Sequence, residues 1–239
     1  MLLAALGTRR PTADIDLLAS AVRSTLDAVA DMIVQILQIP TDDGVEYEAG
    51  RLSARVIRDT ELYAGVRITV PARLDRARAV LRADINVGDP VTPGPVEIDY
   101  PGLLKGSFRL LGYPLATVLA EKLVTMIDRA ETTTRERDFA DVVLLTRRHP
   151  ISGAELLAAL RATAQHRDIR LQPITDLPRL LGPARQTSWS AYLARNGLAG
   201  QLPADYAAAI SAAAAFLDPV LSEAGPRMWN PATGTWTKS

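Results

Sequence analysis

The sequence predicts an α+β protein in which a mixed β-sheet is followed by a helical C-terminal half. Three changes in the hydrophobic pattern support this fold class. Apolar residues recur with a helical period between about 21 and 38, they alternate between 45 and 112, and the helical period returns after Pro114. We therefore expect a sheet domain over residues 1–112, a helical domain over 113–228 and a loose tail over 229–239.

The expected sheet domain begins with a short strand over residues 15–18 and a helix over about 21–38. Alternation is clearest in two later strands, where every second position is apolar: Val66, Ile68 and Val70, then Leu81, Ala83, Ile85 and Val87. A loop rich in Gly and Pro over 88–95 is expected to leave the sheet. Further helices are expected over about 114–129, 135–148, 153–165, 187–196 and 204–222.

Composition excludes several classes of site. The chain has 239 residues, of which 48% are hydrophobic and 23% charged, as in globular proteins with a sizeable core. It has no cysteine, which excludes disulfides, Cys-ligated zinc and thiol nucleophiles. Only His149 and His166 are present, which argues against a His-rich metal site, and we expect both to be structural. A net charge of zero excludes coating of nucleic acid by bulk charge.

The charges are unevenly distributed. Residues 1–50 carry 3 basic and 8 acidic side chains, residues 51–82 carry 8 basic and 3 acidic, and residues 83–239 carry 16 of each. An acidic segment followed by an arginine-rich one fits a site that binds metal cations beside a polyanion, and solvated strand faces are the alternative. Residues 2–6 are too few to span a membrane and no basic region precedes them, so we expect a cytoplasmic protein without membrane contact.

Three aspartates are predicted to share one face of the sheet. Asp14 and Asp16 flank Ile15 in the first strand, and residues two apart in a strand point to the same side. Asp84 lies on the polar face of a later strand, between Ala83 and Ile85. If the two strands are neighbours, three carboxylates meet, and hard oxygen ligands of this kind suit Mg²⁺. An Asp-x-Asp pair alone is common in proteins of every class.

Lys122 lies within the apolar stripe of the expected helix 114–129. A lysine there extends to solvent past its neighbours or meets an anion, because an unpaired buried charge is costly. The functional interpretation is a ligand of a nucleotide phosphate. The next helix begins with Arg135, Arg137 and Asp138, with Asp141 one turn beyond. Arginines near a helix N-terminus can bind phosphate, although pairing with Glu131 or Glu136 explains them equally well.

The order of these segments resembles the nucleotidyltransferase AbiEii/AbiGii toxin family, of the polymerase-β-type nucleotidyltransferase superfamily. The segments, in chain order, are Thr12-Ala13-Asp14-Ile15-Asp16-Leu17, Leu81-Arg82-Ala83-Asp84-Ile85-Asn86, Tyr113-Pro114 through Ala120-Glu121-Lys122-Leu123, and Arg135-Glu136-Arg137-Asp138-Phe139-Ala140-Asp141. The likeness covers about residues 1–195. It implies a Mg²⁺-dependent toxin of a bacterial toxin–antitoxin or phage-defence pair. Such a toxin transfers a nucleotide from an NTP to an acceptor such as the 3′ end of tRNA, and its partner is an AbiEi-type antitoxin.

The resemblance also implies residue roles. Asp14 and Asp16 match the metal-binding pair, and Asp84 matches the third carboxylate, a candidate base for the attacking hydroxyl. Lys122 matches the phosphate-binding lysine and Asp138 the last aspartate of the motif, with Asp141 a secondary candidate. The candidate catalytic set is therefore Asp14, Asp16, Asp84, Lys122 and Asp138. The nucleotide-binding candidates are Arg10, Thr12, Lys122, Arg135 and Arg137.

One departure from the family pattern bears on activity. Members usually carry a helix and a Gly-Gly or Gly-Ser pair just before the segment that matches residues 2–6, whereas this sequence begins at Met1. Either the start lies further upstream or the copy is truncated. Two alternatives therefore stay open: a nucleotidyltransferase that modifies a small molecule such as an aminoglycoside, and an inactive homologue that only binds its antitoxin.

Overall fold

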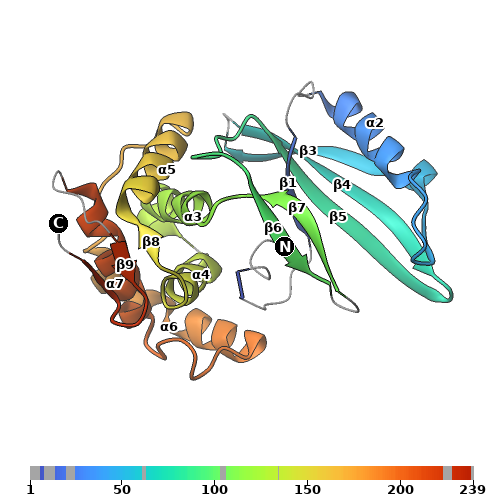
Figure 1. Ribbon diagram of the computed structural model, residues 1–239. Helices are drawn as coiled ribbons and strands as arrows, with labels where there is room; N and C mark the ends of the chain where they lie inside the picture. Colours follow the sequence, from blue (N-terminus) through green and yellow to red (C-terminus); the bar gives the residue numbers. More distant parts are fainter. Residues whose placement is uncertain are drawn as a thin grey trace. The chain divides into compact units, whose positions relative to one another are not determined.

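The computed structural model describes residues 6–7, 14–19, 25–60, 63–102, 106–133, 135–222 and 228–237. The chain forms two compact units, Pro11–Asp89 and Pro90–Ser239, and Leu2–Arg10 joins the second (Figure 1). The division falls within the expected loop over 88–95. It lies before the boundary expected at 112, because the hairpin over residues 96–112 belongs to the helical unit.

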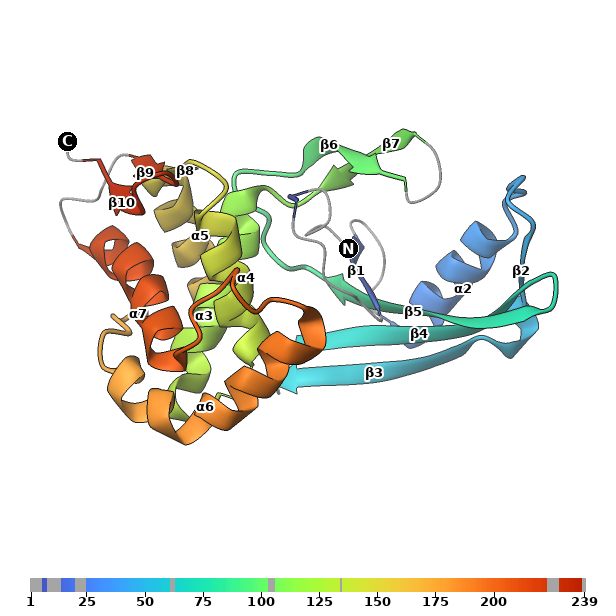
Figure 2. The ribbon, with the colours of Figure 1, turned by 90° about the horizontal axis from the view of Figure 1, so that it is seen from below.

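The first unit is built on a mixed five-stranded sheet in the order β1-β5-β4-β2, with β3 also paired to β4 (Figure 2). β1 runs parallel to β5, and all the other pairs are antiparallel. The strands are β1 (Ile15–Ala19), β2 (Val45–Tyr47), β3 (Ser53–Thr60), β4 (Tyr63–Leu74) and β5 (Ala77–Val87), and a 3₁₀ turn, Ala49–Arg51, precedes β3. The expected alternation is confirmed, because Val66, Ile68 and Val70 are buried on one face.

Helix α2 (Leu26–Leu37) covers the apolar face of this sheet (Figure 1). Its N-terminus is capped by Thr25, whose hydroxyl accepts a hydrogen bond from the backbone N–H of Ala28 at 3.3 Å. Val29 and Ile33 are buried in the same core as Ile68. Since the apolar side chains of the strands face α2, the polar residues between them lie on the opposite face.

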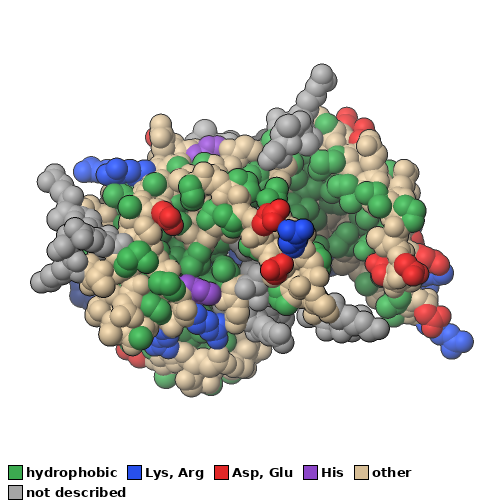
Figure 3. Space-filling model, viewed as in Figure 1, with side chains coloured by type: hydrophobic (Ala, Val, Ile, Leu, Met, Phe, Trp, Pro, Cys, Tyr) green, Lys and Arg blue, Asp and Glu red, His purple; other side chains and the backbone are tan. Residues whose placement is uncertain are grey.

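The second unit is mainly helical and contains one long hairpin. The hairpin consists of β6 (Val96–Pro101) and β7 (Ser107–Gly112). The helices are α3 (Leu115–Arg129), α4 (Glu136–Thr146), α5 (Gly153–His166), α6 (Leu177–Asn196) and α7 (Tyr206–Leu217), with 3₁₀ turns at Ala130–Thr132 and Asp218–Leu221. In Figure 3, basic and acidic side chains lie together over the β6–β7 hairpin. Within this hairpin, Arg109 Nη1 is 3.4 Å from Glu97 Oε2. None of the helices within the described ranges is long and apolar enough to cross a membrane.

Helix α6 is longer than the segment 187–196 that the sequence predicts. It begins at Leu177, and it contains Pro178 in its first turn and Pro183 in its interior. These prolines hide the helical pattern, because proline usually ends or bends a helix. Gly182 lets α6 approach α7 closely, since a Cβ at this position would stand 2.6 Å from the Cβ of Ala207.

The expected loose tail over 229–239 is wrong for its described part. β9 (Met228–Asn230) pairs with β8 (Ile151–Ser152) and with β10 (Thr235–Trp236) in a three-stranded sheet. Trp229 is buried, and its indole N–H donates to the backbone carbonyl of Thr146 at 2.7 Å. The polar sequence around two tryptophans suggested a tail, but the indoles bring this segment into the core.

Candidate active site

Four charged residues form one row across the polar face of the sheet. Asp16 on β1 is in register with Asp84 on β5, Asp84 is opposite Arg67 on β4, and Arg67 is opposite Arg55 on β3. Registered side chains of neighbouring strands lie on the same face. The row therefore passes from two carboxylates to two guanidinium groups within four adjacent strands, and Asp14 lies just before β1.

Arg67 and Asp84 form a two-pronged ion pair at the centre of this row. Arg67 Nε donates to Asp84 Oδ1 at 2.6 Å, and Arg67 Nη2 donates to Asp84 Oδ2 at 2.5 Å. The side chains are 29% and 13% exposed. The hydrogen bond to Asp84 raises the pKa of Arg67 against an opposing effect of burial, and the charges of Asp84, Asp14 and Asp16 raise it further. Both early aspartates thus act on the same guanidinium.

The carboxylates of this face are of the type that binds divalent cations, but among the described residues their arrangement does not form a metal site. The expected neighbours β1 and β5 are paired, so Asp16 and Asp84 lie on one side of the sheet, and Asp14 directly precedes β1. In the part of the chain that the structure describes, no three acidic or histidine side chains are close enough to hold a metal ion. Asp84 instead directs both oxygens at Arg67, so a cation already sits among the carboxylates. Hard oxygen ligands are those that Mg²⁺ prefers.

The same face carries further arginines. Arg82 on β5 is opposite Thr69, and Arg78 is opposite Arg73 on β4. Arg73 pairs with Glu46 of β2 at 2.9 Å. The arginine-rich segment of the sequence therefore contributes to the face that carries the aspartates. Two further candidates, Arg10 and Thr12, lie outside the described residues.

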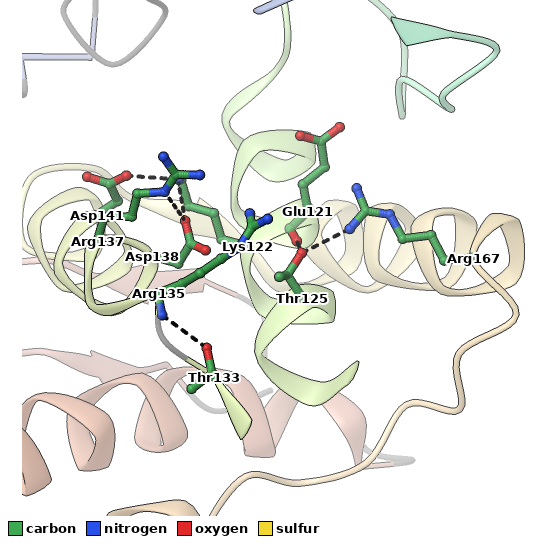
Figure 4. A network of polar contacts seen from close by, with 9 residues as sticks. All are labelled: Glu121, Lys122, Thr125, Thr133, Arg135, Arg137, Asp138, Asp141 and Arg167. Atoms are coloured by element: carbon green, nitrogen blue, oxygen red, sulfur yellow. Dashed lines mark hydrogen bonds and ion pairs between the residues drawn. The ribbon is translucent and has the colours of Figure 1, made fainter. Parts of the chain in front are cut away.

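The second unit has its own charged centre, formed between α3 and α4 (Figure 4). Lys122 Nζ on α3 is 2.8 Å from Asp141 Oδ2 and 3.2 Å from Asp138 Oδ1, both on α4. Arg137 Nε lies 4.0 Å from the same oxygen of Asp138. The prediction that Lys122 extends to solvent or meets an anion is thus resolved. It meets two carboxylates of its own chain.

This Lys122 centre, which we call the second centre, is much less accessible to solvent than the Arg67–Asp84 pair on the sheet, which we call the first centre. The side chain of Lys122 is 15% exposed, while those of Asp138 and Asp141 are 6% and 1% exposed. Burial opposes the charged ammonium, but the charges and hydrogen bonds of Asp141 and Asp138 outweigh it and raise the pKa of Lys122. Lys122 is therefore charged at neutral pH. Among the described residues, these two contacts use two of its three N–H donors.

Arg135 and Arg137 line an open cavity of about 250 Å³ at the start of α4, together with Glu136 and Tyr192. Arg135 precedes the first residue of the helix, and its backbone N–H donates to Thr133 Oγ1 at 3.3 Å. Two guanidinium groups beside a cavity and a helix N-terminus suit an anionic group.

Glu136 was not singled out by the sequence, yet it anchors a buried network. Its Oε1 accepts hydrogen bonds from Ser188 Oγ at 2.6 Å and from Arg185 Nη2 at 2.7 Å, both on α6. Burial raises the pKa of Glu136, but the bonds from Ser188, its own backbone and Arg185 prevail and lower it. Thus Glu136 joins α4 to α6.

Arg67, the partner of Asp84, is the main residue on the sheet face that the sequence did not identify as part of the site. One signal could have found it. The two-residue turn Asp75–Arg76 joins β4 to β5, with Leu74 opposite Ala77, and counting outward from that pair places position 67 opposite 84. Asp75 adopts a positive φ of 50°, as tight turns often require.

The described structure is a mixed α/β protein, with a sheet that displays carboxylates and arginines on one face and a separate helical unit. The sequence matches the family model described as "Nucleotidyl transferase AbiEii toxin, Type IV TA system" over residues 1–216. The chain belongs to this toxin–antitoxin family and is an enzyme of the nucleotidyltransferase class.

Two crystal structures of Helicobacter pylori proteins are similar to the chain. JHP933 shares 15% identity at a TM-score of 0.42, covering 88% of this chain and 79% of that one. A candidate nucleotidyltransferase shares 16% identity at a TM-score of 0.44, covering 89% and 80%. A comparison with functionally curated proteins finds no match.

Proposed function

We propose that the protein transfers a nucleotide from an NTP to the 3′ end of tRNA in a Mg²⁺-dependent reaction. The observation that carries this proposal is the row on the sheet, in which Asp16 and Asp84 are in direct register and arginines continue the row. The family supplies the reaction class. The carboxylates of the row would bind a cation, and the neighbouring guanidinium groups would bind a polyanion.

In this proposal Asp14, Asp16 and Asp84 hold Mg²⁺. A divalent ion at such a site neutralises charge on the phosphates and orients them for in-line attack. Asp84 is also the candidate base for the hydroxyl of the acceptor. Arg67 donates two N–H groups to the Asp84 carboxylate, so Asp84 becomes available to an ion or to the acceptor hydroxyl when this pair opens.

The arginines of the sheet face suit an RNA acceptor. Arg55, Arg78 and Arg82 are exposed or partly exposed on the side that carries Asp84. Guanidinium groups bind phosphate through paired N–H donors, and several of them along one face match the repeated charges of an RNA backbone. A small neutral acceptor would not require this arrangement.

A separate assignment concerns the helical unit. We assign phosphate binding to Lys122, Arg135 and Arg137, and we assign Asp138 the task of holding Lys122 in place. A charged ammonium with a remaining donor is suited to a phosphate oxygen. This assignment is tested by its own variants.

The biological setting follows from the same proposal. Type IV toxin–antitoxin membership implies an antitoxin partner, which we take to be of the AbiEi type. NTPs and tRNA are cytoplasmic, so we place the protein in the cytoplasm. Growth arrest through modified tRNA would serve defence against phage.

The test is a transfer assay with each of the four α-labelled NTPs, total tRNA and Mg²⁺. We expect label on the tRNA 3′ end with the wild type and a loss of at least about a thousandfold with Asp14→Asn or Asp84→Asn, because the metal ligands are removed. Asp31→Asn is the matched control, since Asp31 is exposed on α2, which covers the other face of the sheet. Arg135→Gln and Arg137→Gln test the phosphate assignment through KM for the NTP.

The outcomes separate the alternatives. Label on an aminoglycoside but not on RNA would identify a small-molecule nucleotidyltransferase. Transfer that survives Asp14→Asn would remove the roles assigned to the carboxylates. A folded protein that binds an AbiEi-type antitoxin but transfers no label to any acceptor would be an inactive binding homologue.

A further inference from the structure

The ion pair of Arg67 with Asp84 places a cation of the protein where the carboxylates would hold a metal. Both oxygens of Asp84 accept N–H groups of this one guanidinium, at 2.6 and 2.5 Å. Asp16 is in register with Asp84 on the far side from β4, so the carboxylates and the guanidinium lie in one row. A divalent ion that binds Asp84 must approach the positive charge of Arg67.

The positive charge of Arg67 reduces the electrostatic repulsion between the neighbouring carboxylates. Two or three carboxylates on neighbouring positions repel each other when no cation is present, and this repulsion destabilises the sheet. One guanidinium relieves the repulsion through its bond to Asp84. The same guanidinium then opposes a metal ion by Coulomb repulsion and by occupying oxygen lone pairs.

We propose that Arg67 is an exchangeable counter-cation, which pairs with Asp84 and must release it, at least in part, for a divalent ion to bind there. Its side chain is 29% exposed on an open sheet face, so a released guanidinium can turn toward solvent or toward a phosphate of the substrate. Arg67 is thus a positioning residue that sets the affinity of the site for metal.

This inference rests on the proposed function, because it requires the carboxylates to bind a divalent ion. The experiment measures Mn²⁺ binding to the purified full chain by electron paramagnetic resonance, without NTP or RNA, in wild type, Arg67→Gln, Arg67→Lys and Asp14→Asn. We expect Arg67→Gln to bind Mn²⁺ about tenfold more tightly, which corresponds to ~1.4 kcal/mol. Arg67→Lys keeps the charge but loses the paired donors, so its affinity falls between the two.

Arg55→Gln is the matched control. Arg55 lies in the same row one strand further from Asp84, so its substitution removes one positive charge from the same face without touching the ion pair. We expect Arg55→Gln to change the affinity for Mn²⁺ by less than twofold. A second measurement follows the melting temperature without metal, where Arg67→Gln is less stable than wild type and Mn²⁺ restores more stability to the variant than to wild type.

Two failures are distinguishable. If the wild type binds Mn²⁺ and Asp14→Asn abolishes binding, but Arg67→Gln binds equally or more weakly, the counter-cation role is wrong while the metal site stands. If Asp14→Asn changes nothing, or no variant binds Mn²⁺, the metal site of the proposed function is itself wrong. An equal gain for Arg55→Gln would reduce the role of Arg67 to general charge.

Discussion

The two units each hold a basic side chain between carboxylates, but they differ in access to solvent. Arg67 meets Asp84 on an open sheet face, with 29% and 13% of their side chains exposed. Lys122 meets Asp138 and Asp141 between two helices, where the carboxylates are nearly inaccessible. Water can replace a lost partner in the first centre but not in the second. The first is therefore suited to exchange of partners, and the second to a fixed arrangement.

The two centres also arise from different kinds of chain geometry. Asp138 and Asp141 are three residues apart on α4 and so lie on one side of the helix, facing α3. The row of Asp16, Asp84, Arg67 and Arg55 depends on four strands keeping their register. A change of register would dismantle the first centre and leave the second intact.

The largest effect is expected for Lys122→Met. This change removes the ammonium that two buried carboxylates share, which costs about 3–5 kcal/mol of unfolding free energy. Urea denaturation followed by circular dichroism measures the loss. The double variant Lys122→Met/Asp141→Asn should recover part of it, because one buried charge is removed. A loss below about 1 kcal/mol would mean that solvent reaches this centre as readily as the first.

An intermediate effect is expected at Glu136, and it depends on pH. Because the pKa of Glu136 is lowered in the folded chain, its contribution is present above the ordinary value of 4.5 and is lost as pH falls through the folded value. Glu136→Gln should cost about 1.5–3 kcal/mol at pH 7. Urea midpoints at pH 7 and at acidic pH should show the gap between variant and wild type narrowing. A gap that does not change with pH would contradict an ionised Glu136.

A smaller effect on stability is expected for Arg67→Met. The ion pair is partly exposed, so its loss should cost about 1 kcal/mol in the absence of metal. Raising the salt concentration should reduce the difference, since counterions screen the remaining carboxylates. Thermal melts at low and high NaCl measure this. A cost equal to that of Lys122→Met would remove the contrast between the two centres.

The smallest effect is expected for Arg55→Gln, whose side chain is exposed at the end of the row. Its unfolding free energy should stay within about 0.5 kcal/mol of wild type. Its affinity for tRNA should still fall, because one phosphate contact is lost, and the slope of log affinity against log salt should decrease by about 1. Filter binding at several salt concentrations tests this, and an unchanged slope would place the RNA elsewhere.

Local patterns in the sequence predicted the elements that depend on near neighbours. Alternation of Val66 and Ile68 identified the apolar face of β4, and so placed Arg67 on the polar one. The position of Lys122 in an apolar stripe predicted that it extends to solvent or meets an anion, and in the structure it contacts two carboxylates of α4. The condition that the strands of Asp16 and Asp84 are neighbours is fulfilled, because β1 pairs with β5.

Long-range partners could not be predicted from these patterns. The bond between Arg67 and Asp84 follows from a hairpin register that hydrophobic alternation alone does not specify. The partners of Glu136 lie 49 and 52 residues downstream, and a glutamate in a first helical turn has an ordinary local explanation. The metal-site and phosphate roles remain predictions that the proposed variants test.

The aromatic rings near the C-terminus set a limit on how the chain can be shortened. The family match ends at residue 216, and Phe216 stacks on Trp236 and meets Trp229 edge to face, with ring centroids 5.2 and 4.9 Å apart. The carbonyl of Phe216 also accepts the indole N–H of Trp236. Expression boundaries drawn from homology alone would uncover this ring, and the product would be prone to aggregate. The C-terminal boundary of a shortened chain should therefore be chosen to keep the rings that pack on Phe216, and not at the end of the family match.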